Sequence, residues 1–185
     1  MYFAPKEITL RDGRTAILRS PDPVKDAAEL VQYLYDTAAD TPFVLRTPDE
    51  ISMTVEGEER FLEAVVDSES DCMILCEVDG RIAGNCHLSF MGKKKVRHRC
   101  SVAIALRKAY WGQHIGTAMF EAMIALAKER EGVTVMELEF IEGNARARGL
   151  YEKMGFRITG VHPDAIRQED GKLLALYIMQ KKLEG

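Results

Sequence analysis

Hydrophobic and polar residues follow two different periods along the chain, and the changes of period predict its elements. Short alternating or continuous apolar runs favour strands, whereas apolar residues three and four positions apart favour helices. Asp12-Gly13 and Asp79-Gly80 each separate two strand-like runs, and Asp-Gly at such a place is a strong hairpin signal. We therefore expect strands over residues 8–10, 15–19, 72–78, 82–90, 97–106, 133–141, 156–161 and 173–181.

Four segments have helical spacing instead. The first follows Pro23, and the others cover residues 58–67, 116–131 and 145–154. Gly132 is a suitable residue to end the third helix, and Asn144 is a suitable N-cap for the fourth. This order, with hairpins early and crossover helices late, predicts one mixed α/β domain over residues 1–185 with a mostly antiparallel central sheet.

Composition narrows the class of protein. The chain of 185 residues is long enough for one full core, and its net charge of −4 argues against a general nucleic-acid binder. No apolar stretch approaches the roughly 20 residues that a membrane helix needs, and the N-terminal residues do not resemble a secretory signal. The four cysteines form no C-x-x-C pair, so we expect reduced, mostly buried thiols, no metal site and a cytoplasmic location.

The segment from Tyr110 to Ala118 carries the clearest chemical signal. It contains Gly112 and Gly116 and lies between a strand-like run and an amphipathic helix. Such a loop exposes backbone N–H groups at a helix N-terminus, where a phosphate binds well. A plain strand–helix turn that uses glycine for tight packing is the alternative interpretation.

A second segment decides between these interpretations. It begins at Asn144 and continues through Leu150, Tyr151 and Gly155 to Phe156. Together with the glycine loop, this segment resembles the GNAT family of N-acetyltransferases, and the resemblance covers residues 74–181. It implies acetyl-CoA as co-substrate, a primary amine as acceptor, and a sheet with helices on both faces and a splayed strand pair at the cofactor site.

The resemblance also implies the roles of particular residues. The loop matches the one that wraps the pyrophosphate with backbone N–H groups, and the strand before it matches the one that pairs with the pantetheine arm. His114 departs from the family pattern, which usually has glycine or a basic residue there. The residues expected to bind acetyl-CoA are Ile104, Ala105, Leu106, Gln113, His114, Ile115, Gly116, Thr117, Ala118, Asn144 and Tyr151.

Tyr151 matches the tyrosine that protonates the departing thiolate in many relatives. A phenol has a pKa of about 10 and can therefore act as a general acid at neutral pH. The alternative is a tyrosine that only packs in the core, and for Asn144 the alternative is helix capping alone.

The base that accepts the amine proton is less evident. The strand over residues 99–105 contains no carboxylate, although many relatives have a glutamate there. Glu139 is the candidate we select, with Glu137, His87 and an ordered water as alternatives.

The sequence also leaves alternatives for the identity of the acceptor and for whether the protein is an enzyme. Between Asp49 and Asp71 the chain has nine acids and one base, which suggests a cationic small-molecule or peptide amine, although a solvated helix face has the same composition. A non-catalytic acyl-CoA sensor is the alternative to an enzyme. A P-loop nucleotide site is excluded because the loop lacks the Gly-Lys-Ser/Thr ending. Relatives are often dimers, so we expect a homodimer.

Overall fold

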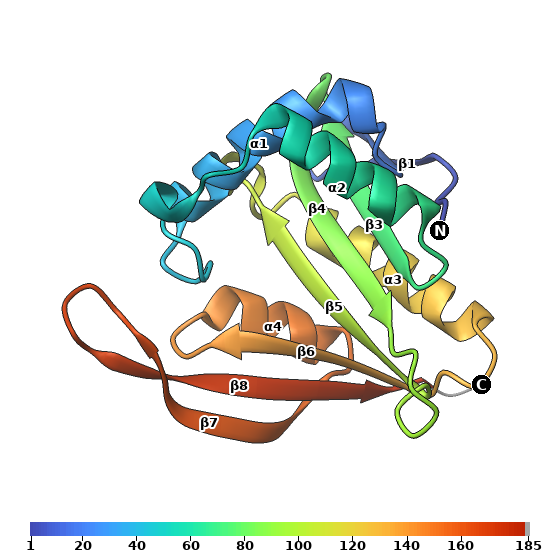
Figure 1. The fold of residues 1–185 in the computed structure, drawn as a ribbon. Helices are drawn as coiled ribbons and strands as arrows, with labels where there is room; N and C mark the ends of the chain where they lie inside the picture. The colour runs from blue at the N-terminus through green and yellow to red at the C-terminus, as the bar shows by residue number, and fades with distance from the viewer. Residues whose placement is uncertain (184–185) are drawn as a thin grey trace. The chain divides into compact units, whose positions relative to one another are not determined.

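The computed structural model describes residues 1–183 and contains eight strands, four α-helices and two short 3-10 helices (Figure 1). Hydrogen bonding orders the strands β1-β2-β3-β4-β5-β6-β8-β7. The strands are β1 (Lys6–Thr9), β2 (Thr15–Arg19), β3 (Asp71–Val78), β4 (Arg81–Phe90), β5 (Arg99–Leu106), β6 (Val135–Ile141), β7 (Arg157–Arg167) and β8 (Leu173–Lys182). The helices are α1 (Pro23–Asp40), η1 (Pro48–Glu50), α2 (Val55–Asp67), η2 (Lys108–Tyr110), α3 (Ile115–Glu129) and α4 (Ala145–Lys153).

The pairing of these strands confirms the expected fold class. The pairs β1–β2, β2–β3, β3–β4, β6–β8 and β7–β8 are antiparallel, and β5 runs parallel to β6. By internal contacts, residues 1–89 and 104–119 form one compact unit, and residues 90–103 together with those from 120 onward form a second. That these units are one domain over residues 1–185 stays a prediction, and its last two residues lie outside the described ones.

The first unit is built on two hairpins whose turns follow the Asp-Gly signals. Asp79 and Gly80 have φ of 51° and 75°, and two positive φ values give the tight turn that matches strand twist. Helices α1 and α2 pack on the sheet of this unit through buried apolar residues. This core cluster consists of Ala27, Leu30, Tyr33, Leu62, Val65, Met73, Leu75 and Ile82.

Helix α2 begins earlier than its hydrophobic spacing predicts. The Thr54 hydroxyl accepts the N–H of Gly57 at 3.1 Å and so caps a helix that starts at Val55 rather than at residue 58. Glu58 consequently lies in the first turn, four residues before Leu62, and is 4% exposed. A charged residue thus shares the buried side of the helix with Leu62 and Val65.

Replacing Glu58 with glutamine is expected to stabilise the protein at pH 8. Burial raises the pKa of Glu58, although the charge of Arg46 lowers it in part. The folded state therefore holds the proton more tightly than the unfolded state, and the native glutamate costs stability once pH rises through its folded pKa. Thermal melts of Glu58→Gln should show a gain at pH 8 that disappears near pH 4. Glu56→Gln, at an exposed position in the same turn, is the control, and an equal gain in both variants would contradict the assignment.

The second unit has its core between β6, β8 and the helices α3 and α4. Aromatic rings meet there edge to face: Phe120 lies 5.5 Å from Tyr151 and 5.6 Å from Phe156, measured between ring centroids. Phe140 stacks on Tyr177 at 5.1 Å. This aromatic cluster fixes the helix that carries Asn144 and Tyr151.

The expected end of the seventh strand at residue 161 is wrong. The run His162-Pro163-Asp164 has the composition of a turn, but the structure has a bulge there, with Asp164 at a φ of 54°. Pairing with β8 resumes at Ile166 and Leu174. Because a bulge absorbs extra residues without ending a ladder, β7 continues to Arg167.

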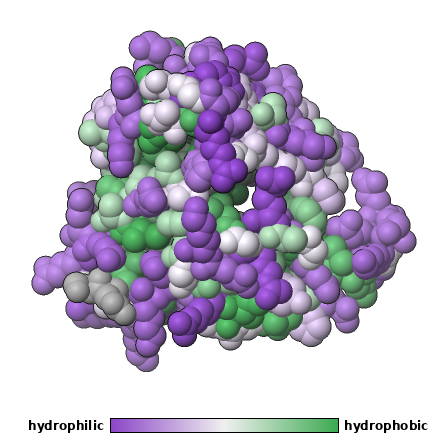
Figure 2. Space-filling model, turned by 180° about the vertical axis from the view of Figure 1, so that it is seen from behind, coloured by the Kyte–Doolittle hydropathy of each residue, from purple (hydrophilic) through white to green (hydrophobic). Residues whose placement is uncertain are grey.

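The face shown in Figure 2 is mostly hydrophilic, and the four cysteines are buried. Hydrophilic side chains cover most of the face shown in Figure 2, with hydrophobic patches between them. No helix among residues 1–183 is long and apolar enough to cross a membrane. Cys72, Cys76, Cys86 and Cys100 are free and buried, and burial raises the pKa of Cys76 and of Cys100 to about 12.

Candidate functional site

The loop between β5 and α3 has the geometry of an anion site. Gly112 and His114 have φ of 81° and 69°, and the chain then enters α3. The helical hydrogen bonds begin with the one from the Ala118 N–H to the His114 carbonyl, at 3.1 Å. The N–H groups of residues 115–117 therefore precede the helical ladder and point out of the helix N-terminus. A Cβ added at Gly112 would meet nothing within 4 Å, so the backbone is open to a ligand there.

The side chains of this loop take little part in that geometry. The Gln113 side chain accepts the Asp12 N–H at 3.2 Å and is thus directed to the turn between β1 and β2. His114 is exposed. Its φ of 69° lies in the region that favours glycine. The backbone is therefore the part of the loop suited to a pyrophosphate.

The end of β5 is held by donors from outside the strand. The Tyr33 hydroxyl donates to the Ala105 carbonyl at 2.6 Å, and the Trp111 indole N–H donates to the Leu106 carbonyl at 2.9 Å. The Arg107 N–H donates to the carbonyl of Ala83 on β4 at 3.0 Å. Sequence reasoning selected residues 104–106 but missed Tyr33 and Trp111, which fix them.

The parallel pairing of β5 with β6 is short. Their parallel pairing covers Arg99 to Ser101 against Val135 to Glu137 and then stops, although both strands continue. A splayed strand pair, which the resemblance implied, would show such an early end of pairing, and the splay itself stays a prediction.

Asn144 and Tyr151 lie on α4 in the second unit, two helical turns apart. The Asn144 side chain accepts the Ala147 N–H at 3.1 Å, so the predicted capping is confirmed and the side-chain amide nitrogen is left for another contact. Tyr151 is 7% exposed and packs against the rings of Phe120, Phe140 and Phe156. Burial raises the pKa of Tyr151 to about 12, so its hydroxyl stays protonated at any pH at which the protein would work.

The candidate bases differ in how they are engaged. Glu137 forms a close ion pair with Arg99, and the Gln180 amide lies 3.4 Å from it. The His87 Nε2 lies 3.4 Å from Asp71, and burial lowers the pKa of His87 although Asp71 opposes this shift. Glu139 is exposed on β6, opposite Ile178 of β8, with no ion-pair partner among residues 1–183. Of the three candidates, Glu139 is the one least committed to structural contacts.

Comparison with known protein families identifies the family of the chain. A family model described as the acetyltransferase (GNAT) family matches residues 27–156. The chain belongs to the GNAT acetyltransferase family. The matched segment includes the loop, strands β5 and β6, and the helix with Tyr151.

Solved and curated GNAT proteins resemble the chain to different extents. A GNAT acetyltransferase structure from Streptococcus pneumoniae is 31% identical with a TM-score of 0.84, over 91% of this chain and 99% of that one. A Bacillus subtilis protein that bears the name of a ribosomal protein bS18-alanine N-acetyltransferase is 26% identical over 57% of this chain and 66% of its own length. A methionine sulfoximine and methionine sulfone acetyltransferase from Pseudomonas paraeruginosa is 32% identical over 44% and 46%. The chain thus spans less than two thirds of either curated relative.

No metal centre accompanies these GNAT features in the described part of the chain. Residues 1–183 contain no group of three or more His, Cys, Asp or Glu side chains that could hold a metal ion.

Proposed function

We propose that this protein transfers the acetyl group of acetyl-CoA to a primary amine by direct attack in a ternary complex. The observation that carries the proposal is the open N-terminus of α3, the first α-helix after β5, in a chain of the GNAT family. The residues present fit the donor: N–H groups of residues 115–117 suit its pyrophosphate, and the backbone of Ile104, Ala105 and Leu106 suits an extended amide-bearing arm. Bound there, acetyl-CoA supplies an activated acyl group.

In this proposal, residues of the chain stabilise the charge that develops on the thioester and transfer protons. Backbone N–H groups of β5 polarise the thioester carbonyl. The amine nitrogen forms the new C–N bond as the C–S bond breaks, and Tyr151 gives its proton to the sulfur. The proton lost by the amine goes to Glu139, directly or through water. Asn144 donates to the arm of the donor with its side-chain amide.

We propose a cationic amine as the acceptor. The relatives' names include both a protein N-terminal alanine and a small amino-acid analogue, so they do not favour one size of acceptor. The acidic segment instead favours an acceptor with a positive charge. Glu56 is exposed on α2, and acids outnumber bases nine to one between Asp49 and Asp71. A cation near this segment is favoured by the summed field.

Turnover with a panel of amines tests this function. Thiol release from acetyl-CoA would be followed with polyamines, lysine peptides, peptides with free N-termini and a neutral-tailed monoamine. We expect the highest kcat/KM for an acceptor that keeps a second positive charge. Binding of acetyl-CoA without turnover of any amine would favour the acyl-CoA sensor instead. Equal kcat/KM for the cationic and neutral-tailed amines would contradict the charge preference alone.

A further inference from the structure

Four polar residues form one stripe along α1. Glu29, Tyr33, Asp36 and Asp40 are spaced by four, three and four positions, which places them on one side of a helix. We call this set the α1 stripe. All four members contact residues 105–108, where β5 ends and the chain turns toward the loop before α3.

Tyr33 makes the innermost contact of the stripe. Its side chain is 1% exposed, and its hydroxyl accepts the Asn85 N–H at 3.2 Å while donating to the Ala105 carbonyl at 2.6 Å. Asn85 lies on β4 and Ala105 on β5, so the hydroxyl stands between backbone groups of the two strands. Burial raises the pKa of Tyr33, which keeps the donating proton in place.

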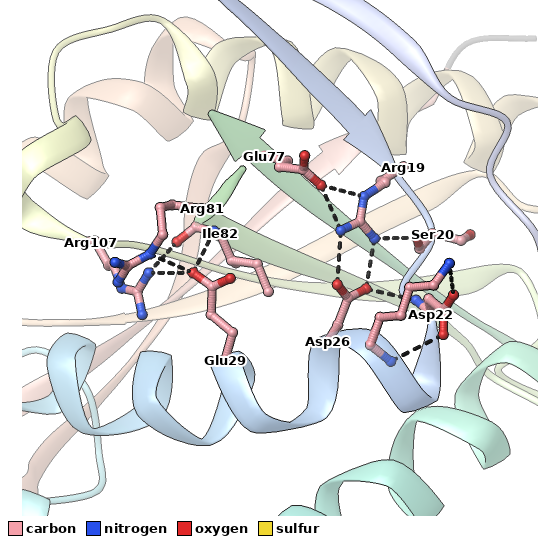
Figure 3. Close-up of polar contacts among 10 residues, drawn as sticks. Arg19, Ser20, Asp22, Asp26, Glu29, Glu77, Arg81, Ile82 and Arg107 are labelled. Atoms are coloured by element: carbon pink, nitrogen blue, oxygen red, sulfur yellow. Dashed lines mark hydrogen bonds and ion pairs between the residues drawn. The ribbon is translucent and has the colours of Figure 1, made fainter. Parts of the chain in front are cut away.

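Arg107, the residue after the end of β5, contacts Glu29, Asp36 and Tyr33 of the α1 stripe. Its guanidinium donates to the Ile82 carbonyl at 2.7 Å and to Glu29 at 3.1 Å, and its Nε lies 3.0 Å from Asp36. Figure 3 shows Arg107 and Arg81 converging on Glu29, which also accepts the Ile82 N–H. The Arg107 guanidinium carbon lies 5.4 Å from the centre of the Tyr33 ring. These contacts leave Arg107 6% exposed.

Asp40 completes the set at the end of α1. Its carboxylate accepts the Lys108 N–H at 2.7 Å. An acid in the last turn of a helix is disfavoured by the helix dipole, so Asp40 does not stabilise α1 through the dipole. Its hydrogen bond instead holds Lys108, the first residue of η2.

We propose that Tyr33 is a positioning residue for acetyl-CoA binding, acting with Asp40 through the backbone of β5. Tyr33 and Trp111 occupy the carbonyls of Ala105 and Leu106, and Asp40 occupies the N–H of Lys108. The backbone at the end of β5 is therefore fixed before a ligand arrives, and a preorganised strand binds with a smaller ordering cost. The inference rests on the proposed function, in which residues 104–106 hold the donor.

Acetyl-CoA affinity of three variants tests this role. Tyr33→Phe leaves two buried backbone groups without their partner, and we expect acetyl-CoA to bind about tenfold more weakly. Asp40→Ala removes only a half-buried acceptor, and we expect a loss of about threefold. Tyr35→Phe is the matched control, because the Tyr35 hydroxyl on the same helix donates to the Ile51 carbonyl at 2.7 Å without touching β5.

Titration calorimetry with acetyl-CoA and thermal melts would be measured on all four proteins. A merely structural role predicts that Tyr33→Phe and Tyr35→Phe lose thermal stability while both keep the wild-type affinity, and that result would overturn the inference. If Tyr33→Phe does not fold, Asp40→Ala decides: wild-type affinity in that variant would overturn it as well. Failure of the wild-type protein to bind acetyl-CoA would instead overturn the proposed function on which the inference rests.

Discussion

Replacing Tyr151 with phenylalanine is expected to lower kcat by about two to four orders of magnitude. The substitution keeps the ring in its contacts with Phe120, Phe140 and Phe156 and removes only the proton that the leaving sulfur would take. Acetyl-CoA affinity and the melting temperature should therefore stay close to those of the wild-type protein. Steady-state kinetics and calorimetric titration would measure the two effects separately.

Tyr177→Phe is the control for this substitution. Tyr177 belongs to the same aromatic cluster, stacked on Phe140 at 5.1 Å, and has no proposed part in the reaction. An unchanged kcat in Tyr151→Phe would exclude the hydroxyl as the general acid. Because the pKa of Tyr151 is raised to about 12, its loss of the proton cannot cause a fall in kcat between pH 7 and pH 10.

Replacing Gly84 with alanine is expected to destabilise the protein by about 1–3 kcal/mol and to weaken acetyl-CoA binding. A Cβ at this position on β4 would stand 2.1 Å from the Leu106 side chain and 2.9 Å from the Ala105 carbonyl oxygen. The leucine can rotate, but the carbonyl belongs to the backbone. The end of β5 must therefore move, and residues 104–106 move with it. Urea denaturation and acetyl-CoA titration would show both losses.

A second strand glycine provides the comparison for Gly84. A Cβ at Gly160 of β7 would meet its nearest neighbour, an Ile178 side-chain atom, at 3.4 Å, which is ordinary contact. Gly160→Ala should leave stability and acetyl-CoA affinity nearly unchanged. If Gly84→Ala behaves like Gly160→Ala, the close approach of β4 to β5 does not constrain the proposed donor site.

Local signals were enough to predict the turns, the helix cap and the loop. Asp79-Gly80, Asn144 and the glycine of the loop at Gly112 each act within a few residues of chain, so their consequences can be inferred without the fold. The extent of β7 could not, because the bulge at Asp164 is held by pairing with β8 rather than by its own residues.

Long-range contacts account for the rest. Tyr33 and Ala105 are 72 positions apart, and nothing near either residue indicates that one holds the other. The polar spacing of the α1 stripe was visible in the sequence, but there it is typical of a solvated helix side. Glu58 is one of the nine acids between Asp49 and Asp71, and only the fold shows that its position is buried. The homodimer and the cytoplasmic location stay predictions.

The four cysteines bear on how the reaction can be followed. Each turnover would release a free coenzyme A thiol, and a chromogenic disulfide reagent would detect that thiol together with any accessible protein thiol. Cys72, Cys76, Cys86 and Cys100 are buried and reluctant to ionise, and only a thiolate attacks a disulfide. The folded protein should thus be silent toward a chromogenic disulfide reagent, so that colour reports product alone, while a slow colour increase without substrate would report unfolding.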